Sequence, residues 1–264
     1  GLALLANLTA YDFGYIPAGQ LIERTANALH AMETLERHQG HFYNWYDTRT
    51  LHPLDPRYVS SVDSGNLAGH LLVLGNGCRE LIQQCPLEGD LFAGIDDAFR
   101  LLREALAEIP DQGQTHTVTR KQLSQAVEML AMGLQSRPAD ALGWTSRFRQ
   151  LITSARTVAD MAQAFSQERA EGPEGELRVW ADAVRACVES HLRDVELLFP
   201  WVRLGPKDLV ALFDHQSGPA PEWSAIASFF HPIPTLAAAP ERFVEALCAL
   251  ECLREQLRSC PSQD

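Results

Sequence analysis

The sequence predicts an all-α fold built from antiparallel helical hairpins, and three observations support this class. Apolar residues recur with the helical period through most of the chain, and the longest regular stripe consists of Leu177, Trp180, Val184, Val188, Leu192 and Val195. Joints rich in glycine and proline separate the helical stretches, at 110–113, 171–175, 205–206 and 217–221. Strand signals are confined to residues near 41–60, where we expect a small irregular β-hairpin.

The first two helices of the chain carry recognisable start and stop signals. A helix is predicted over Leu2–Tyr11, ending at Gly14, with four leucines facing inward, namely Leu2, Leu4, Leu5 and Leu8. A second helix is predicted over residues 18–37. Pro17 suits its start, where a missing N–H does no harm, and Gly40 suits the position after its end.

The helical pattern stops after Gly40 and resumes near residue 61. Aromatic residues over 41–46 favour a strand, and 47–50 reads as a turn. The next helix is predicted over 61–81, capped by Asp63 or Ser61. Further helices are predicted at 90–109, 118–135, 139–169, 176–199, 206–214, 221–229 and 239–258.

Composition excludes several classes of function. A chain of 264 residues with 46% hydrophobic and 21% charged residues can bury a sizeable core. The net charge of -12 argues against duplex nucleic acid and anionic membrane surfaces as partners. No apolar run approaches the ~20 residues of a membrane span. The six cysteines lack the spacing of metal ligands, so we expect reduced thiols and neither a metal nor a cofactor.

One segment, Gly40–Asn66, departs from its surroundings in a way that suggests a carbohydrate site. Sugar sites combine flat aromatic faces with rigidly placed amides and carboxylates. The candidate substrate-binding residues are Tyr43, Asn44, Trp45, Tyr46, Asp47, Asp63, Ser64 and Asn66, and Tyr58 adds a further aromatic ring. Composition equally allows a hydrophobic plug over a helical bundle, with Asp63 and Ser64 serving only as helix caps.

The stretches GLALLANLTAYDFGYIPAG and GHFYNWYDTRTLHPLDPRYVSSVDSGNLAGHLL closely resemble the cyclic β-1,2-glucan synthases of bacteria. The resemblance is to the start of their glycoamylase-like, or cyclisation, region. It covers about the first 75 residues strongly, and the remaining helices match only in type. It implies an (α/α)6-barrel type of fold and transglycosylation, in which a linear β-1,2-glucan is cut and closed on its own end.

The resemblance also implies a division of labour within a larger protein. Residues 1–85 would be the N-terminal part of the glycoamylase-like domain with its sugar-cleft motif, and 86–264 a helical insertion or continuation of it. Two carboxylates perform retaining glycosyl transfer, and the family places that pair further along than this chain extends. We therefore assign no catalytic residue and expect the isolated chain, which looks like an excised piece, to be inactive.

The implied partners are a β-1,2-glucan chain and the other domains of the parent synthase. The implied location is the cytoplasm, in a region without a membrane span, within a parent protein of the bacterial inner membrane. Two alternatives remain: a helical structural or interaction domain of the large synthase, and part of a β-1,2-glucan hydrolase. Whether Trp45 and Asp63 face an open cleft or a packed interior bears on this choice.

Overall fold

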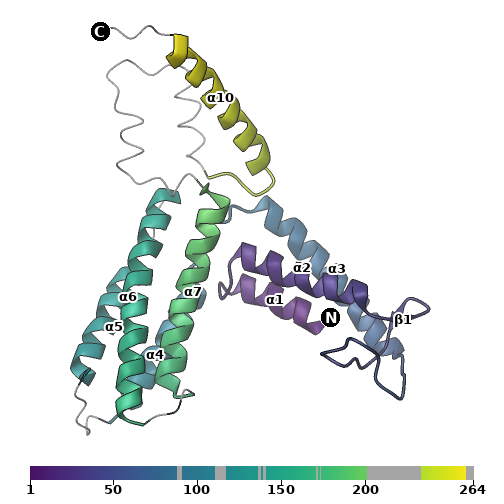
Figure 1. Ribbon diagram of the computed structural model, residues 1–264, viewed down its shortest axis with the longest axis horizontal. Coiled ribbons are helices and arrows are strands. Elements are labelled where there is room, and N and C mark those ends of the chain that lie inside the picture. The colour runs from purple at the N-terminus through teal and green to yellow at the C-terminus, as the bar shows by residue number, and fades with distance from the viewer. Residues whose placement is uncertain are drawn as a thin grey trace. The chain divides into compact units, whose positions relative to one another are not determined.

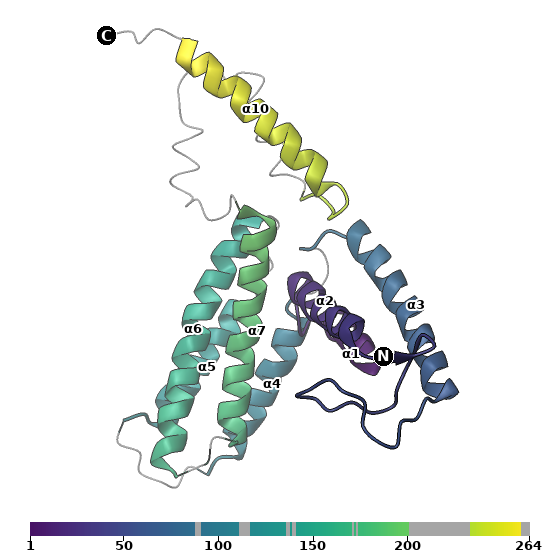
Figure 2. The same cartoon turned by 45° about the vertical axis from the view of Figure 1, so that its right-hand side comes forward.

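The computed structural model describes residues 1–87, 91–110, 117–135, 138, 141–170, 172, 174–200 and 233–259. These residues form eight helices and one pair of short strands (Figures 1 and 2), so the predicted all-α class is confirmed. A closed (α/α)6 barrel stays a prediction. The helices predicted at 206–214 and 221–229 lie outside the described residues. The chain divides into an N-terminal unit, Gly1–Leu81, and a C-terminal unit, Ile82–Asp264.

The N-terminal unit begins with a helical hairpin, which Figure 1 shows at the start of the colour scale. Its two helices are α1 (Leu2–Asp12) and α2 (Ala18–Thr34). Leu4 and Leu8 are buried on α1, as predicted, but Leu2 is 74% exposed. Residues two apart on a helix point in nearly opposite directions, so Leu2 cannot share a face with Leu4.

A short strand pair follows α2, and it begins earlier than the sequence suggests. Strand β1 (Arg37–His38) pairs antiparallel with β2 (His41–Phe42). Gln39 and Gly40 join them with φ of 50° and 87°. Positive φ at both central residues is what the tightest two-residue hairpin turn requires. The predicted helix through residue 37 is therefore wrong, because α2 ends at Thr34 and Gly40 turns a hairpin instead.

Helix α3 (Ser61–Gln83) completes the N-terminal unit and packs against α1. The contact depends on Gly77, because a Cβ atom added there would come within 2.7 Å of Leu8 Cδ1. Leu74 and Leu81 lie on the same face of α3 and are buried. The N-terminal core is thus assembled from residues near both ends of the unit.

The C-terminal unit contains a four-helix bundle (Figures 1 and 2). In the bundle, α7 packs against α4 and α6, and α6 packs against α5. Two ion pairs show that α6 and α7 are antiparallel, since Arg149 pairs with Glu196 and Arg156 with Glu189. The four helices are α4 (Ala93–Glu108), α5 (Arg120–Leu134), α6 (Ala141–Glu168) and α7 (Glu176–Leu198).

The apolar stripe predicted along α7 lies in the bundle core. Leu177, Val184, Val188 and Val195 are buried, and the other two members of the stripe, Trp180 and Leu192, pack against the same cluster. An aromatic group lies beside it. The ring of Phe148 is 5.5 Å from those of Phe92 and Trp144 and 5.8 Å from that of His191, measured between centroids.

The buried imidazole of His191 should make the bundle sensitive to acid. Burial lowers the pKa of His191, although the hydrogen bond that Nδ1–H donates to the Cys187 carbonyl, 2.9 Å long, opposes the shift. Because the unfolded chain binds this proton more readily, stability is fully present above pH ~6.5 and falls as the pH drops below it. Urea unfolding at pH 7.5 and 5.5 should show this loss, and His191→Gln should reduce the difference. An equal pH dependence in the variant would contradict the assignment.

Helix α10 (Ala239–Ser259) follows the described segment at 233–238. The Ala237 backbone N–H donates to the Ile82 carbonyl at 2.7 Å, which ties this segment to the start of the C-terminal unit. In the part of the chain that the structure describes, no helix combines the length and the apolar character needed to cross a membrane.

Candidate functional site

The start of α3 is fixed by hydrogen bonds from the aromatic segment. Ser60 caps the helix, because its Oγ accepts from the backbone N–H of Asp63 at 3.1 Å. The prediction that Asp63 or Ser61 caps this helix is therefore wrong, because the cap lies one residue before Ser61. Asn44 reaches across from the segment, accepting from the Ser60 N–H through Oδ1 at 3.2 Å and donating from Nδ2 to Asp63 Oδ2 at 3.1 Å.

A tyrosine hydroxyl holds the strand pair to the following loop. Tyr46 donates from its hydroxyl to the Glu36 carbonyl at 2.7 Å and accepts from the Tyr43 backbone N–H at 2.8 Å. The rings of Tyr43 and Tyr46 meet edge to face, with centroids 6.3 Å apart. Arg57 lies over the Tyr43 ring and pairs with Glu36 at 2.8 Å. Both tyrosines are consequently fixed in orientation.

Asp47 organises the turn that the sequence predicts over residues 47–50. Its Oδ1 accepts from the backbone N–H groups of Arg49 and Thr50, each at 2.8 Å. These bonds favour the ionised carboxylate, so the N–H groups of Thr50 and Arg49 lower the pKa of Asp47. The carboxylate is therefore engaged by its own turn.

His41 and Ser64 connect the strand pair to α3. Ser64 donates its hydroxyl proton to the Ser60 carbonyl at 2.8 Å. His41 Nδ1 lies 3.2 Å from Ser64 Oγ and therefore serves as the donor of that second bond. The Ser64 proton is directed at the backbone, so the geometry favours a structural role over a nucleophilic one.

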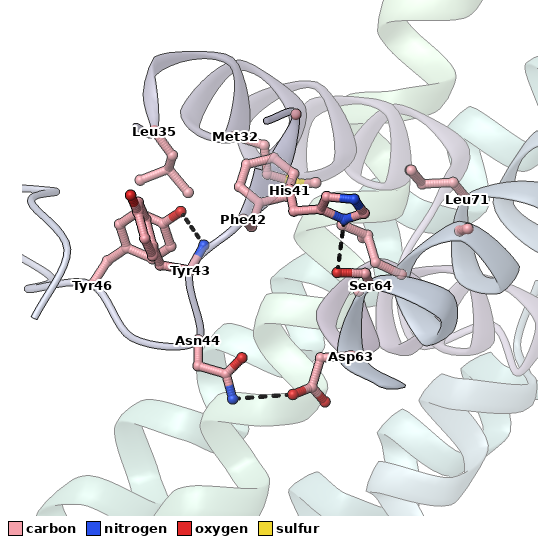
Figure 3. A pocket seen from close by; sticks show the side chains of 14 residues that line it. Met32, Leu35, His41, Phe42, Tyr43, Asn44, Tyr46, Asp63, Ser64 and Leu71 are labelled. Carbon is pink, nitrogen blue, oxygen red and sulfur yellow. Dashed lines mark hydrogen bonds between the residues drawn. The ribbon is translucent and has the colours of Figure 1, made fainter. Parts of the chain in front are cut away.

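Residues of this region border an open pocket of about 500 Å³ within the N-terminal unit. Figure 3 shows side chains of α2, the aromatic segment and α3 converging on it. Met32 and Leu35 contribute apolar surface from α2, and Leu71 does so from α3. Polar atoms of Asn44 and Asp63 gather at one end (Figure 3). A volume of this size, mostly apolar with a few convergent polar groups, is typical of sites for small organic ligands.

The structure separates the predicted site residues into two groups. Five of them line the pocket, namely Tyr43, Asn44, Tyr46, Asp63 and Ser64. Trp45, Asp47 and Asn66 are not among its lining residues. Trp45 is 52% exposed and stacks on Tyr58, while Asn66 is exposed on α3. Neither Trp45 nor Asp63 is buried in a packed interior.

Several lining residues were not predicted from the sequence. His41 and Phe42 belong to the aromatic segment, so composition alone could have included them. Leu67 and Leu71 also line the pocket, one and two helical turns after Asp63. That spacing places them on the same face of α3, and the sequence carried this signal.

The pocket has binding chemistry, but its described lining lacks a second carboxylate. Among the described residues that line it, Asp63 is the single carboxylate. Glycosyl transfer uses two carboxylates. In the described ranges, no three side chains of His, Cys, Asp or Glu gather where they could hold a metal ion. The arrangement can accept and donate hydrogen bonds beside apolar and aromatic surface.

Comparison with known proteins bears on what such a pocket binds. No family model matches the chain. The chain is 33% identical over 196 residues to the cyclic beta-(1,2)-glucan synthase NdvB of Rhizobium meliloti (strain 1021). The matched stretch is 74% of this chain and 7% of that protein. It exceeds the motif in the first 75 residues, so the similarity reaches further into the helices than the sequence analysis suggested. The predicted resemblance to cyclic β-1,2-glucan synthases is confirmed, over a small part of such a protein's length.

Proposed function

We propose that the pocket of the N-terminal unit binds a linear β-1,2-glucan as one part of the substrate cleft of a transglycosylase. The observation that carries the proposal is the convergence of Asn44, Asp63 and Ser64 beside the rings of Tyr43 and Tyr46 in one pocket. Vicinal sugar hydroxyls need acceptors and donors at fixed positions, and a pyranose ring needs flat apolar surface. Similarity to a cyclic glucan synthase supports a glucan as the ligand.

Asp63 would provide the strongest single contact in this pocket. A carboxylate that accepts from a hydroxyl forms a charge-assisted hydrogen bond. Asn44 Nδ2 orients the Asp63 carboxylate through Oδ2. The second oxygen of this carboxylate can accept from a sugar hydroxyl. Because the side chain is already ordered, binding costs little further conformational entropy.

Replacement of this carboxylate tests the proposal. In the full chain, Asp63→Asn should weaken the binding of linear β-1,2-glucan oligosaccharides about tenfold, measured by calorimetry. Because Ser60 caps α3, the unfolding free energy should fall by less than about 1 kcal/mol, the scale of a first-turn carboxylate's interaction with the helix dipole. Asp47→Asn is the matched control. The amide oxygen of the new side chain can still accept the hydrogen bonds of the turn, and Asp47 lies outside the pocket lining. Equal affinity in both variants, or no binding by the unmodified chain, would reject the proposal.

We also infer that this chain contributes binding and not the bond-breaking step. A single carboxylate in the pocket lining supports this. Incubation of the full chain with linear β-1,2-glucan should yield neither shortened nor cyclic products by chromatography. Steady product formation above a mock-purified control would show that the chain carries its own catalytic pair.

A second candidate, a structural or interaction role within a parent synthase, has support from α3. Val62, Leu72 and Val73 are 69%, 72% and 50% exposed on this helix. Exposed apolar surface of this kind commonly marks protein contacts. The two roles are compatible, because these residues do not line the pocket. On this proposal, the partners are other domains of the synthase, on the cytoplasmic side of the inner membrane.

A further inference from the structure

We propose that Trp45 and Tyr58 form a second sugar-binding surface beside the pocket, which stacks against a further pyranose ring of the same glucan. We call this surface the Trp45–Tyr58 platform. The inference rests on the proposed function of the pocket. The sequence analysis names Trp45 as a candidate substrate-binding residue, and the structure places it outside the pocket lining.

The two rings stack on each other, and both residues remain half exposed to solvent. Their centroids are 6.2 Å apart and their planes differ by 29°. Trp45 is 52% exposed and Tyr58 is 54% exposed. Large aromatic side chains usually bury most of their area, so a half-exposed stacked pair marks a contact surface. A second exposed pair in the same unit, Phe13 and Tyr15, meets edge to face at 63° and offers no comparable shared surface.

Both platform residues are held by backbone hydrogen bonds. The Tyr58 carbonyl accepts from the Asn44 N–H at 2.8 Å, and the Trp45 carbonyl accepts from the Leu54 N–H at 3.0 Å. Tyr46 forms a bridge with Pro53, which closes the loop between the two rings. A surface whose backbone is already ordered loses little conformational entropy when a ligand binds.

The platform adjoins the pocket through Asn44. This residue lines the pocket with its side chain, precedes Trp45 in the chain and donates to Tyr58. On this proposal, a linear oligosaccharide of a few units in the pocket extends past Asn44 to the platform, whereas a disaccharide confined to the pocket does not need it.

The chemistry of the surface favours a neutral sugar over a charged ligand. Aromatic faces carry partial negative charge, which suits the C–H groups on the face of a pyranose. The net charge of -12 disfavours phosphate-bearing ligands. Asn44, which precedes Trp45, carries a neutral amide, and the Asp47 carboxylate is engaged by the backbone N–H groups of its own turn. A protein partner at this surface would show itself in the association state of the chain.

The experiment compares sugar lengths. Binding of a β-1,2-linked glucose disaccharide and of long linear β-1,2-glucan oligosaccharides is measured by calorimetry on the full chain. Trp45→Ala and Tyr58→Ala should weaken binding of the long oligosaccharides about three- to tenfold and leave disaccharide binding unchanged. Trp45→Phe should retain most of the affinity. Phe13→Ala is the control for loss of an exposed ring and should change neither. Circular dichroism confirms folding of each variant.

Each other outcome overturns the platform. Unchanged binding of long oligosaccharides in both alanine variants excludes stacking there. A parallel loss for the disaccharide places the rings in the pocket and not beside it. A change in sedimentation with unchanged sugar affinity assigns the surface to a protein contact. If the unmodified chain binds neither sugar, the proposed function itself fails, whereas failure of the platform alone leaves the effect of Asp63→Asn intact.

Discussion

Phe148→Ala should lower the unfolding free energy of the C-terminal unit by about 3–5 kcal/mol. Phe148 has no exposed surface, and its ring meets three other rings within the bundle. Truncation removes the transfer free energy of the ring and leaves a cavity whose rigid aromatic walls can collapse only in part. Urea unfolding followed by far-UV circular dichroism measures the change, because most of the bundle's helix melts with its core.

Met132→Ala is the matched control for this experiment. Met132 lies on α5 in the same unit but is 64% exposed, so its truncation should change stability by less than about 0.5 kcal/mol. A loss below about 1 kcal/mol for Phe148→Ala would show that the aromatic cluster is not a core. The glucan affinity of both variants should match that of the unmodified chain at temperatures where the N-terminal unit is folded.

Asn44→Ala should reduce glucan affinity more than tenfold and destabilise the start of α3 by about 1–3 kcal/mol. The change removes the acceptor for the half-buried Ser60 N–H and the donor that orients Asp63. It thereby affects both the helix terminus and the pocket wall. Calorimetry with long oligosaccharides and thermal unfolding measure the two effects separately.

Two further variants separate these contributions. Asn66→Ala removes an exposed amide from α3 and should change neither property, whereas a loss of glucan affinity would place Asn66 in the site. Asn44→Asp keeps an acceptor for Ser60 but replaces the donor facing Asp63, 3.1 Å away, with a carboxylate. It should therefore preserve more stability than Asn44→Ala while still weakening binding. Wild-type affinity in Asn44→Asp would remove Asn44 from the site.

The described helices of the C-terminal unit could be predicted closely from the sequence. For α7 the expected range 176–199 and the observed Glu176–Leu198 nearly coincide. A long helix repeats its apolar signal over many turns, and Leu177, Val184 and Val188 are buried as that period requires. The local apolar pattern is sufficient to predict a helix when one face of that helix packs into a single core.

The region after α2 could not be predicted at the same level. Arg37 pairs with Phe42 only after the chain has turned, and Gln39 adopts the left-handed conformation without being one of the residues that usually announce it. Strand pairing depends on two segments that contact each other, whereas helix propensity can be read from one segment alone. The predicted helix end was displaced for this reason.

The composition of the candidate site was easier to predict than its geometry. Aromatic and amide content identified the segment, and Asn44 and Asp63 do meet at 3.1 Å. Trp45 lies outside the pocket lining although both its neighbours line it, and its ring stacks on Tyr58 instead. Sequence composition does not specify which side faces the ligand.

The contact between Leu8 and Gly77 has a consequence for the order of folding. The helix pairs α5–α6 and α6–α7 of the bundle join neighbours in the chain, whereas α1 must meet α3 across most of the N-terminal unit. Closing that longer loop costs more chain entropy, so these pairs should form before α1 docks. Gly1 and Asp63 line the same pocket, so sugar binding becomes possible only when this late step is complete. Recovery of glucan affinity during refolding should lag behind the recovery of helical signal.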